Sequence, residues 1–192
     1  MRSHNLSEKK MIWFTSDTHF GHENVIKFCN RPFRDVDHMN SELILRWNEK
    51  VKNGDQIYHL GDFSFMKKPE TEKLLSRLKG QIFLVRGNHD HKDTRGIKSF
   101  AWVKDYHEIK VEIDGQKQLI VLSHYPILSW HNRHYGAWHL HGHCHGSLPD
   151  EGVRRIDVGC DVYGYSPVSL DEINNIMKNR PITSVDHHTV KI

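Results

Sequence analysis

The segment Trp138–Gly146 carries four histidines at alternate positions, His139, His141, His143 and His145. In an extended chain, residues i and i+2 share a face, so His143 and His145 can point their imidazoles at one small volume while Cys144 points away. Imidazole is the commonest metal-binding side chain in proteins. The spacing therefore predicts that this segment supplies ligands to a metal ion.

Four further polar motifs each follow an apolar, strand-like run. They are Asp17-Thr18-His19, Gly61-Asp62, Gly87-Asn88-His89-Asp90 and Ser123-His124. Ligands of open α/β sheets gather at the carboxyl ends of strands, so we expect all five motifs to meet. Carboxylate, imidazole and amide groups together suit two divalent transition metals, with a carboxylate able to bridge them. Two such ions about 3.5–4 Å apart activate a shared water and neutralise phosphoryl oxygens, which predicts phosphoester hydrolysis.

The elements that would position these motifs alternate in the first half of the chain. We expect strands at Met11–Ser16, Gln56–Leu60 and Gln81–Val85, and helices at Asp35–Val51 and Pro69–Lys79. Asp35 is a plausible N-cap, and Pro69 suits the first turn of a helix. Such alternation predicts a largely parallel sheet.

The second half of the chain is rich in strand signals. Asp114-Gly115 between the apolar runs Tyr106–Ile113 and Gln116–Leu122 predicts a hairpin, and Trp138–His141 and Arg154–Val158 are further strand candidates. Ser169 and Glu172 form a capping box for a last helix that runs to about Asn179. Two packed sheets covered by helices satisfy this order.

Composition limits the class of protein. A chain of 192 residues predicts one domain, with a core at about 11–180. The formal charge of +3 lacks the basic excess of a dedicated nucleic-acid binder, although it does not exclude a nucleic-acid substrate. Three cysteines without CxxC spacing favour a reducing, cytoplasmic setting over a disulfide framework. The apolar run Met11–Phe14 is too short to span a membrane, so we expect no membrane association.

In the order DxH, GD, GNHD, H and GHxH, the five motifs resemble those of the calcineurin-like metallophosphoesterase family, from Trp13 to His145. The resemblance, which is to short bacterial and phage members, implies an α/β fold that is a two-sheet αββα sandwich. It also implies a single-domain, metal-dependent enzyme that hydrolyses a phosphodiester or phosphomonoester. We expect that substrate to be small or nucleotide-derived, because the chain lacks a large appended capture domain.

The resemblance also implies a dinuclear metal centre. One metal would be held by Asp17, His19 and His145, the other by Asn88, His124 and His143, and Asp62 would bridge them. His89 would act as an acid or transition-state stabiliser near the leaving oxygen, and Asp90 would orient it by accepting its other ring proton. Manganese is the metal we expect first, but iron, nickel, cobalt and zinc also fit such ligands.

Several residues have competing interpretations. His22, Arg31, Arg86 and Arg133 are candidates for contacting substrate, yet His22 could also cap a helix and arginines usually serve solvation. Asp17 and Asp62, taken alone, read as turn or capping residues, and His124 as a partly buried histidine. His139 and His141 are expected in the core or behind the ligands. The insert Trp130–Gly136 suits either a loop that binds a base or sugar phosphate, or a plain surface loop.

Two other functions stay open from the sequence. A nuclease or nucleic-acid end-processing phosphodiesterase would need a basic groove, which composition does not show but local arginines could supply. A non-catalytic scaffold that keeps the fold after losing its metals should lack ligands or His89, and this chain lacks none. Oligomeric state is not indicated.

Overall fold

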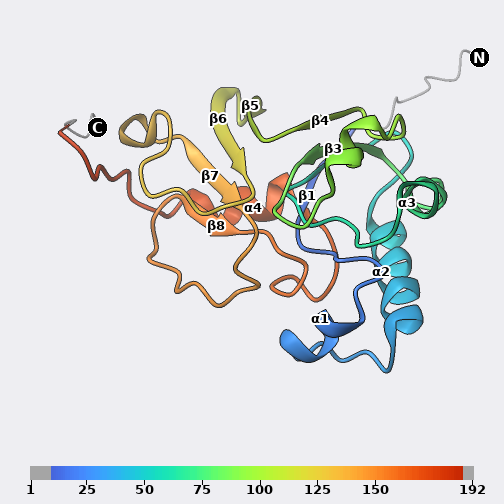
Figure 1. Ribbon diagram of the computed structural model, residues 1–192. Coiled ribbons are helices and arrows are strands. Elements are labelled where there is room, and N and C mark those ends of the chain that lie inside the picture. The colour runs from blue at the N-terminus through green and yellow to red at the C-terminus, as the bar shows by residue number, and fades with distance from the viewer. Residues whose placement is uncertain (1–9, 188–192) are drawn as a thin grey trace, which may run out of the picture.

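The structure, a computed structural model that describes residues 10–187, consists of two β-sheets packed face to face (Figure 1). The first sheet has the order β4-β3-β2-β1-β9. Its strands are β1 (Ile12–Thr15), β2 (Gln56–His59), β3 (Gln81–Val85), β4 (Trp102–Lys104) and β9 (Val168–Ser169). Strands β1 to β4 run parallel, as the alternating pattern predicts, and β9 closes one edge antiparallel to β1.

The second sheet has the order β5-β6-β7-β8. Its strands are β5 (Tyr106–Ile113), β6 (Gln116–Ser123), β7 (Trp138–His141) and β8 (Arg155–Asp157). Strands β5 and β6 form the predicted hairpin, in which Asp114 and Gly115 both adopt positive φ, and β6, β7 and β8 run parallel. The predicted fold, an α/β sandwich of two sheets, is therefore confirmed.

Four α-helices accompany the sheets. They are α1 (Glu23–Phe28), α2 (Val36–Lys50), α3 (Lys68–Leu75) and α4 (Leu170–Met177). Asp35 caps α2 by accepting the His38 N–H at 2.8 Å, and Ser169 and Glu172 form the predicted capping box of α4. Helix α3 ends four residues before the predicted Lys79, because i→i−3 hydrogen bonds tighten the chain after Leu75 into a turn.

Alternating side chains of the first sheet pack into two separate cores. Ile57 and Leu84 face a core that they share with Leu43 and Trp47 of α2. Phe14, Tyr58 and Val85 point the other way, into the core between the sheets, where α4 also contributes Ile173 and Met177. Figure 1 shows α2 and α3 on one side of the molecule and β6, β7 and β8 on the other, with β1 and β3 between. Burial on both faces explains why these strands read as continuous apolar runs.

The two sheets are joined at the edge where their parallel strands end. Ser16, directly after β1, forms a parallel bridge with Gly159, which follows β8. The N–H of Cys160 donates to the Ser16 carbonyl at 2.9 Å. At the same edge, hydrogen bonds join the loops after β1 and β2, the loops after β2 and β3, and the loops after β6 and β7. Among residues 10–187, no helix is long and apolar enough to cross a membrane.

Candidate metal centre

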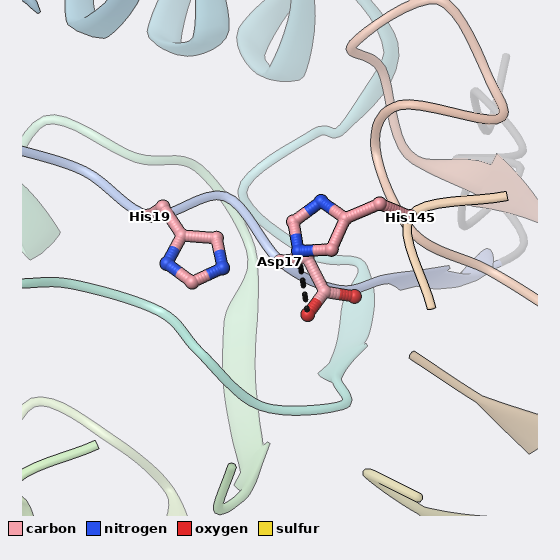
Figure 2. A group of neighbouring side chains, drawn as sticks. All are labelled: Asp17, His19 and His145. Atoms are coloured by element: carbon pink, nitrogen blue, oxygen red, sulfur yellow. Dashed lines mark ion pairs between the residues drawn. The ribbon is translucent and has the colours of Figure 1, made fainter. Parts of the chain in front are cut away.

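The five motifs meet at the seam between the sheets. The predicted ligands are Asp17 and His19 after β1, Asp62 after β2, Asn88 after β3, His124 after β6, and His143 and His145 after β7. Around Asp17 the ligand atoms of Asp17, His19 and His145 all lie within 4.8 Å of one another (Figure 2). A second group that meets the same criterion joins Asp17 to Asp62 and His124. The structure thus brings together residues that are far apart in the sequence.

One carboxylate oxygen lies between the two groups. Asp62 Oδ2 is 3.5 Å from His19 Nε2 and 3.6 Å from His124 Nε2. The other oxygen of Asp62, Oδ1, accepts the backbone N–H of His89 at 2.8 Å, which fixes the carboxylate. This oxygen is therefore close to a ring nitrogen of both His19 and His124.

The ring nitrogens of His124 have different partners. Nδ1 lies 2.8 Å from the Leu60 carbonyl, which can only accept, so Nδ1 carries the proton. Burial lowers the pKa of His124, which keeps the ring neutral and leaves a lone pair on Nε2. His124 Nε2 lies 2.9 Å from Asn88 Oδ1, and the same oxygen lies 3.1 Å from His143 Nδ1. Such a cluster of electron-pair donors is satisfied by a cation.

Other buried atoms of the centre lack partners. Asp17 Oδ1 and both ring nitrogens of His19 have no hydrogen bond within the described chain. Burial raises the pKa of Asp17 to about 8 and lowers the pKa of His19 to about 2. Without a cation, the buried carboxyl would be protonated at neutral pH, and unpaired buried polar atoms are costly. A divalent cation would satisfy them, so the residues present fit a metal.

The backbone at these positions is unusual. Five of the seven predicted ligands have positive φ, with values of 56° at Asp17, 49° at His19, 56° at Asp62, 70° at His143 and 48° at His145. A non-glycine residue in this region costs of the order of 1–3 kcal/mol. Such strain is typical of functional sites. Its concentration at five predicted ligands therefore supports a binding role for these residues.

Two motif glycines allow the loops to pack together. A Cβ added to Gly61 would lie 2.5 Å from His124 Nδ1, and one added to Gly87 would lie 2.2 Å from Asp62 Oδ1. Neither contact is sterically possible without movement. Gly61 and Gly87 therefore admit neighbouring ligand side chains, His124 and Asp62.

Asp90 has a different role from the predicted one. Its carboxylate accepts three backbone N–H groups, from Asp62 at 2.9 Å, Phe63 at 2.9 Å and Gly87 at 2.8 Å. It therefore fixes the backbone of two motifs and does not hold the ring of His89. Burial raises the pKa of Asp90 to about 6, although these hydrogen bonds oppose the shift. The exposed imidazole of His89 lies beside Phe65, with ring centroids 5.0 Å apart.

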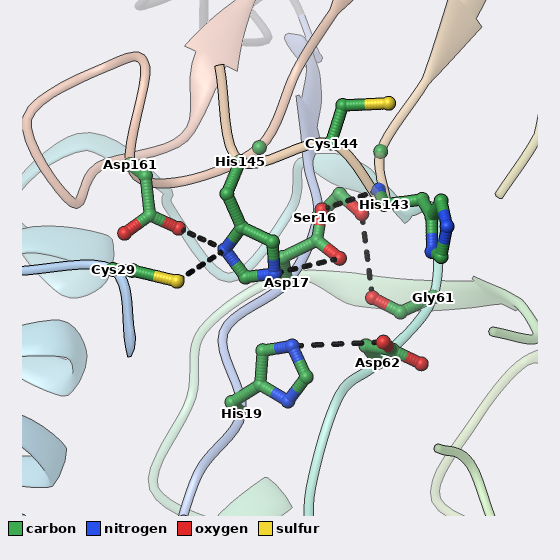
Figure 3. Close-up of polar contacts among 12 residues, drawn as sticks. Ser16, Asp17, His19, Cys29, Gly61, Asp62, His143, Cys144, His145 and Asp161 are labelled. Atoms are coloured by element: carbon green, nitrogen blue, oxygen red, sulfur yellow. Dashed lines mark hydrogen bonds and ion pairs between the residues drawn. The ribbon is translucent and has the colours of Figure 1, made fainter. Parts of the chain in front are cut away.

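Asp161 contacts His145 on the side away from Asp17 (Figure 3). The sequence did not predict it as an individual site residue. Its Oδ2 lies 2.7 Å from His145 Nδ1, with Cys29 Sγ 3.3 Å from the same nitrogen. Burial alone would lower the pKa of His145, but Asp161 and Asp17 raise it above its ordinary value. Because Asp161 accepts the proton on Nδ1, Nε2, which lies 3.9 Å from Asp17 Oδ1, is the nitrogen that would bind a cation. Asp161 lies in the segment after β8, outside every motif, so only its tertiary pairing reveals it.

Arg31 does not contact substrate, which corrects its prediction. Its side chain is buried, with two 2.8 Å hydrogen bonds to Asp161 and one of 2.7 Å to the Asp17 carbonyl. The guanidinium therefore stabilises the centre from behind. It presents no free donors to a phosphate.

Arg133 is also wrongly predicted as a substrate contact. It is buried, donates to Thr183 Oγ1 and the Leu128 carbonyl, and lies 4.6 Å from the ring centroid of Trp130. Trp130 is itself buried against Val121 and Ala137. The insert Trp130–Gly136 thus covers the outer face of the second sheet, as a surface loop would.

The other candidates remain near the surface or behind the centre. Arg86 forms an ion pair with Asp105 at 2.9 Å. His22 stacks on Phe65 with ring centroids 3.8 Å apart and lies 5.5 Å from the ring of His19, beside the centre. His139 is fully buried, and its Nε2 accepts the N–H of Ile127, as expected of a core histidine.

Comparison with known proteins gives the same family as the motifs. The model of the calcineurin-like phosphoesterase superfamily domain matches residues 11–159, which include all seven predicted ligands. An uncharacterized protein of Methanocaldococcus jannaschii is 37% identical over 177 residues, which are 88% of this chain and 92% of that protein. The gene 66 protein of Mycobacterium phage D29 is 29% identical over 88% of this chain and 96% of its own.

A solved structure supports the same assignment of fold. The crystal structure of a protein of unknown function from Aquifex aeolicus aligns with a TM-score of 0.66 and 28% identity, covering 88% of this chain and 100% of that one. The match of the family model spans well over half of the chain and contains every motif. The chain therefore belongs to the calcineurin-like phosphoesterase superfamily.

Proposed function

We propose that this protein is a dinuclear metallophosphoesterase that hydrolyses a phosphodiester or phosphomonoester that is small or nucleotide-derived. The observation that carries the proposal is the position of Asp62 Oδ2, 3.5 Å from His19 Nε2 and 3.6 Å from His124 Nε2. A single carboxylate oxygen within reach of two histidines from different ligand groups supports two neighbouring cations.

The residues divide into two sets. Asp17, His19 and His145 would hold one cation, Asn88, His124 and His143 the other, and Asp62 both. Two divalent cations held there would supply Lewis acidity, which lowers the pKa of water and neutralises phosphoryl oxygens. The mixed nitrogen and oxygen donors suit manganese first, and also iron, nickel, cobalt or zinc.

The remaining residues position groups and move protons. His89 is exposed, and its backbone N–H donates to Asp62 Oδ1 at 2.8 Å. Its imidazole donates a proton to the ester oxygen that leaves as the phosphorus–oxygen bond breaks. Asp161 accepts the proton on Nδ1 of His145. Asp90 accepts the backbone N–H groups of Asp62 and of Gly87, the residue before Asn88, and so fixes the backbone of both predicted ligands.

Turnover by metal-stripped protein tests this function. Added manganese should restore hydrolysis of bis-p-nitrophenyl phosphate or p-nitrophenyl phosphate, and a metal count should approach two ions per chain. The ratio of the two rates distinguishes diesterase from monoesterase. A protein that binds no metal and turns over neither ester would refute the proposal and favour a scaffold.

We also propose that the protein is cytoplasmic and that residues 10–187 form one domain. Cys29, Cys144 and Cys160 are all free thiols, which is the state that a reducing compartment maintains. The bridge between Ser16 and Gly159 ties the two sheets together, which supports one domain.

A further inference from the structure

A cavity of about 690 Å³ opens beside the candidate metal centre. Two of its walls are the predicted ligands His143 and His145, and it extends to Phe28, Asn30 and Leu148. A phosphoester whose phosphorus lies at the metal centre must place its organic group in a neighbouring space. This cavity is continuous with the ligands and is therefore a natural place for that group.

The cavity has an apolar rim. Phe28, the last residue of α1, is 77% exposed, and Leu148 is 37% exposed. Nearby, the 49% exposed Tyr125 lies against His143, with ring centroids 4.7 Å apart. Exposed apolar side chains that gather around a polar site are typical of a ligand-binding groove. They favour a ligand with an apolar surface next to its phosphate.

The cavity is also lined by Asn30, whose side-chain amide can form hydrogen bonds to a ligand. Asn30 lies two residues after Phe28, and its side-chain amide makes no hydrogen bond to any residue between 10 and 187. An amide offers both donors and an acceptor, and an exposed phenylalanine offers a stacking face. Together they suit a flat heterocycle with polar edges better than an acyl chain, which has neither a stacking face nor hydrogen-bonding groups along its length.

The charge of the cavity favours a single nucleotide over a polymer. None of its eight lining residues is lysine or arginine. Nucleic-acid strands are bound by neutralising several phosphates with such cations. A groove without them suits a ligand with one phosphate group, which the metal centre itself would neutralise.

We propose that Phe28 and Asn30 form a nucleobase subsite: the base of a mononucleotide ester stacks on Phe28, and Asn30 hydrogen-bonds its edge. This assignment rests on the proposed function, since it takes the phosphate to lie at the metal centre. The base contributes to specificity and takes no part in the chemical step.

Binding of two non-hydrolysable ligands tests the subsite. The phosphonate analogue of adenosine 5′-monophosphate carries the base, and methylphosphonate does not. Each would be titrated by calorimetry into manganese-loaded wild type, Phe28→Ala and Phe28→Tyr. Leu45→Ala is the matched control, because Leu45 is 51% exposed on α2 and does not line the cavity.

The expected result is selective. Stacking on an aromatic side chain contributes about 1–3 kcal/mol per base, so Phe28→Ala should weaken the affinity for the adenosine ligand about 5- to 150-fold and leave the affinity for methylphosphonate unchanged. Phe28→Tyr and Leu45→Ala should bind both ligands like wild type. Equal affinity of wild type for the two ligands, or an equal loss for both in Phe28→Ala, would overturn the subsite. Failure of the proposed function shows separately, as absence of metal-dependent turnover of both bis-p-nitrophenyl phosphate and p-nitrophenyl phosphate by wild type.

Discussion

The backbone N–H of Asp62 donates a 2.9 Å hydrogen bond to the carboxylate of Asp90. The same carboxylate accepts the N–H of Gly87, the residue before Asn88. One buried side chain therefore sets the relative position of the second and third motifs, and it contacts the predicted ligand Asp62 only at its backbone N–H.

Replacing Asp90 with asparagine should impair both catalysis and stability. In one orientation, the asparagine NH₂ would face the N–H groups of Asp62 and Gly87; in the other, it would face the N–H of Phe63. Either way, at least one buried N–H donor loses its acceptor, which costs about 1–3 kcal/mol. We expect kcat/KM for bis-p-nitrophenyl phosphate to fall at least tenfold, with a lower Tm. Asp93→Asn, an exposed change three residues further along the chain, is the control. Unaltered kinetics and Tm in Asp90→Asn would show that this anchor is dispensable.

His89 and Asp62 should separate proton donation from metal binding. His89→Ala should retain two metals and lose about 10²–10⁴ in kcat, because it removes a general acid and no ligand. Asp62→Ala should lose metal pairing and turnover together. Inductively coupled plasma analysis of each variant, alongside kcat, distinguishes them. Wild-type rate in either variant would contradict the assigned roles.

Arg31→Ala should destabilise the fold strongly. It would leave the buried Asp161 without its cation and two carbonyls without their donor, and breaking a buried pair costs about 3–5 kcal/mol. Arg86→Ala removes a partly exposed pair and should cost at most about 1 kcal/mol. Urea unfolding of the two variants gives the comparison. Equal free energies of unfolding would mean that the buried Arg31 pair contributes no more than the partly exposed Arg86 pair.

Asp55 should make stability depend on pH. Burial would raise its pKa, but hydrogen bonds from the backbone of Lys52 and Met11 and from the Trp13 indole outweigh burial and lower it. A lowered pKa stabilises the fold above the ordinary aspartate pKa of about 3.9, and this contribution is lost as the pH falls through the folded-state value.

Asp55→Asn is the variant that tests this contribution. We expect it to be about 2 kcal/mol less stable than wild type at pH 7, with a difference that shrinks toward pH 3. Urea midpoints across this range measure it. A difference that is independent of pH would assign the loss to packing and not to charge.

Sequence patterns predicted the strands well because most are buried and bounded by turns. Strands β3 and β7 begin and end at the predicted residues, and the capping box of Ser169 begins α4 as expected. The short β9 and β4 were not predicted, since two or three residues give no periodicity. Their positions depend on the neighbouring strand with which each pairs.

Residue type and spacing predicted which side chains gather at the seam, but not which partners surround each charged group. Arg31 and Arg133 were candidates for contacting substrate, with solvation as the alternative, yet both are buried, because oxygens of residues distant in sequence pair with them. Asp161 had no motif to mark it. The positive φ of Asp17 and His145 also has no signal in the sequence, since neither is glycine. These features arise from tertiary pairing, which local patterns do not encode.

The seam between the sheets makes metal uptake a measure of completed folding. Asp17 and Asp62 follow strands of the first sheet, whereas His124 and His145 follow strands of the second, so neither sheet alone holds a complete ligand group. A half-folded chain with undocked sheets would have only fragments of the centre. Because a ligand that binds only the native state stabilises it by mass action, metal would selectively stabilise the docked sandwich against every partly folded form. Cellular metal supply would then set the lifetime of this protein as well as its activity.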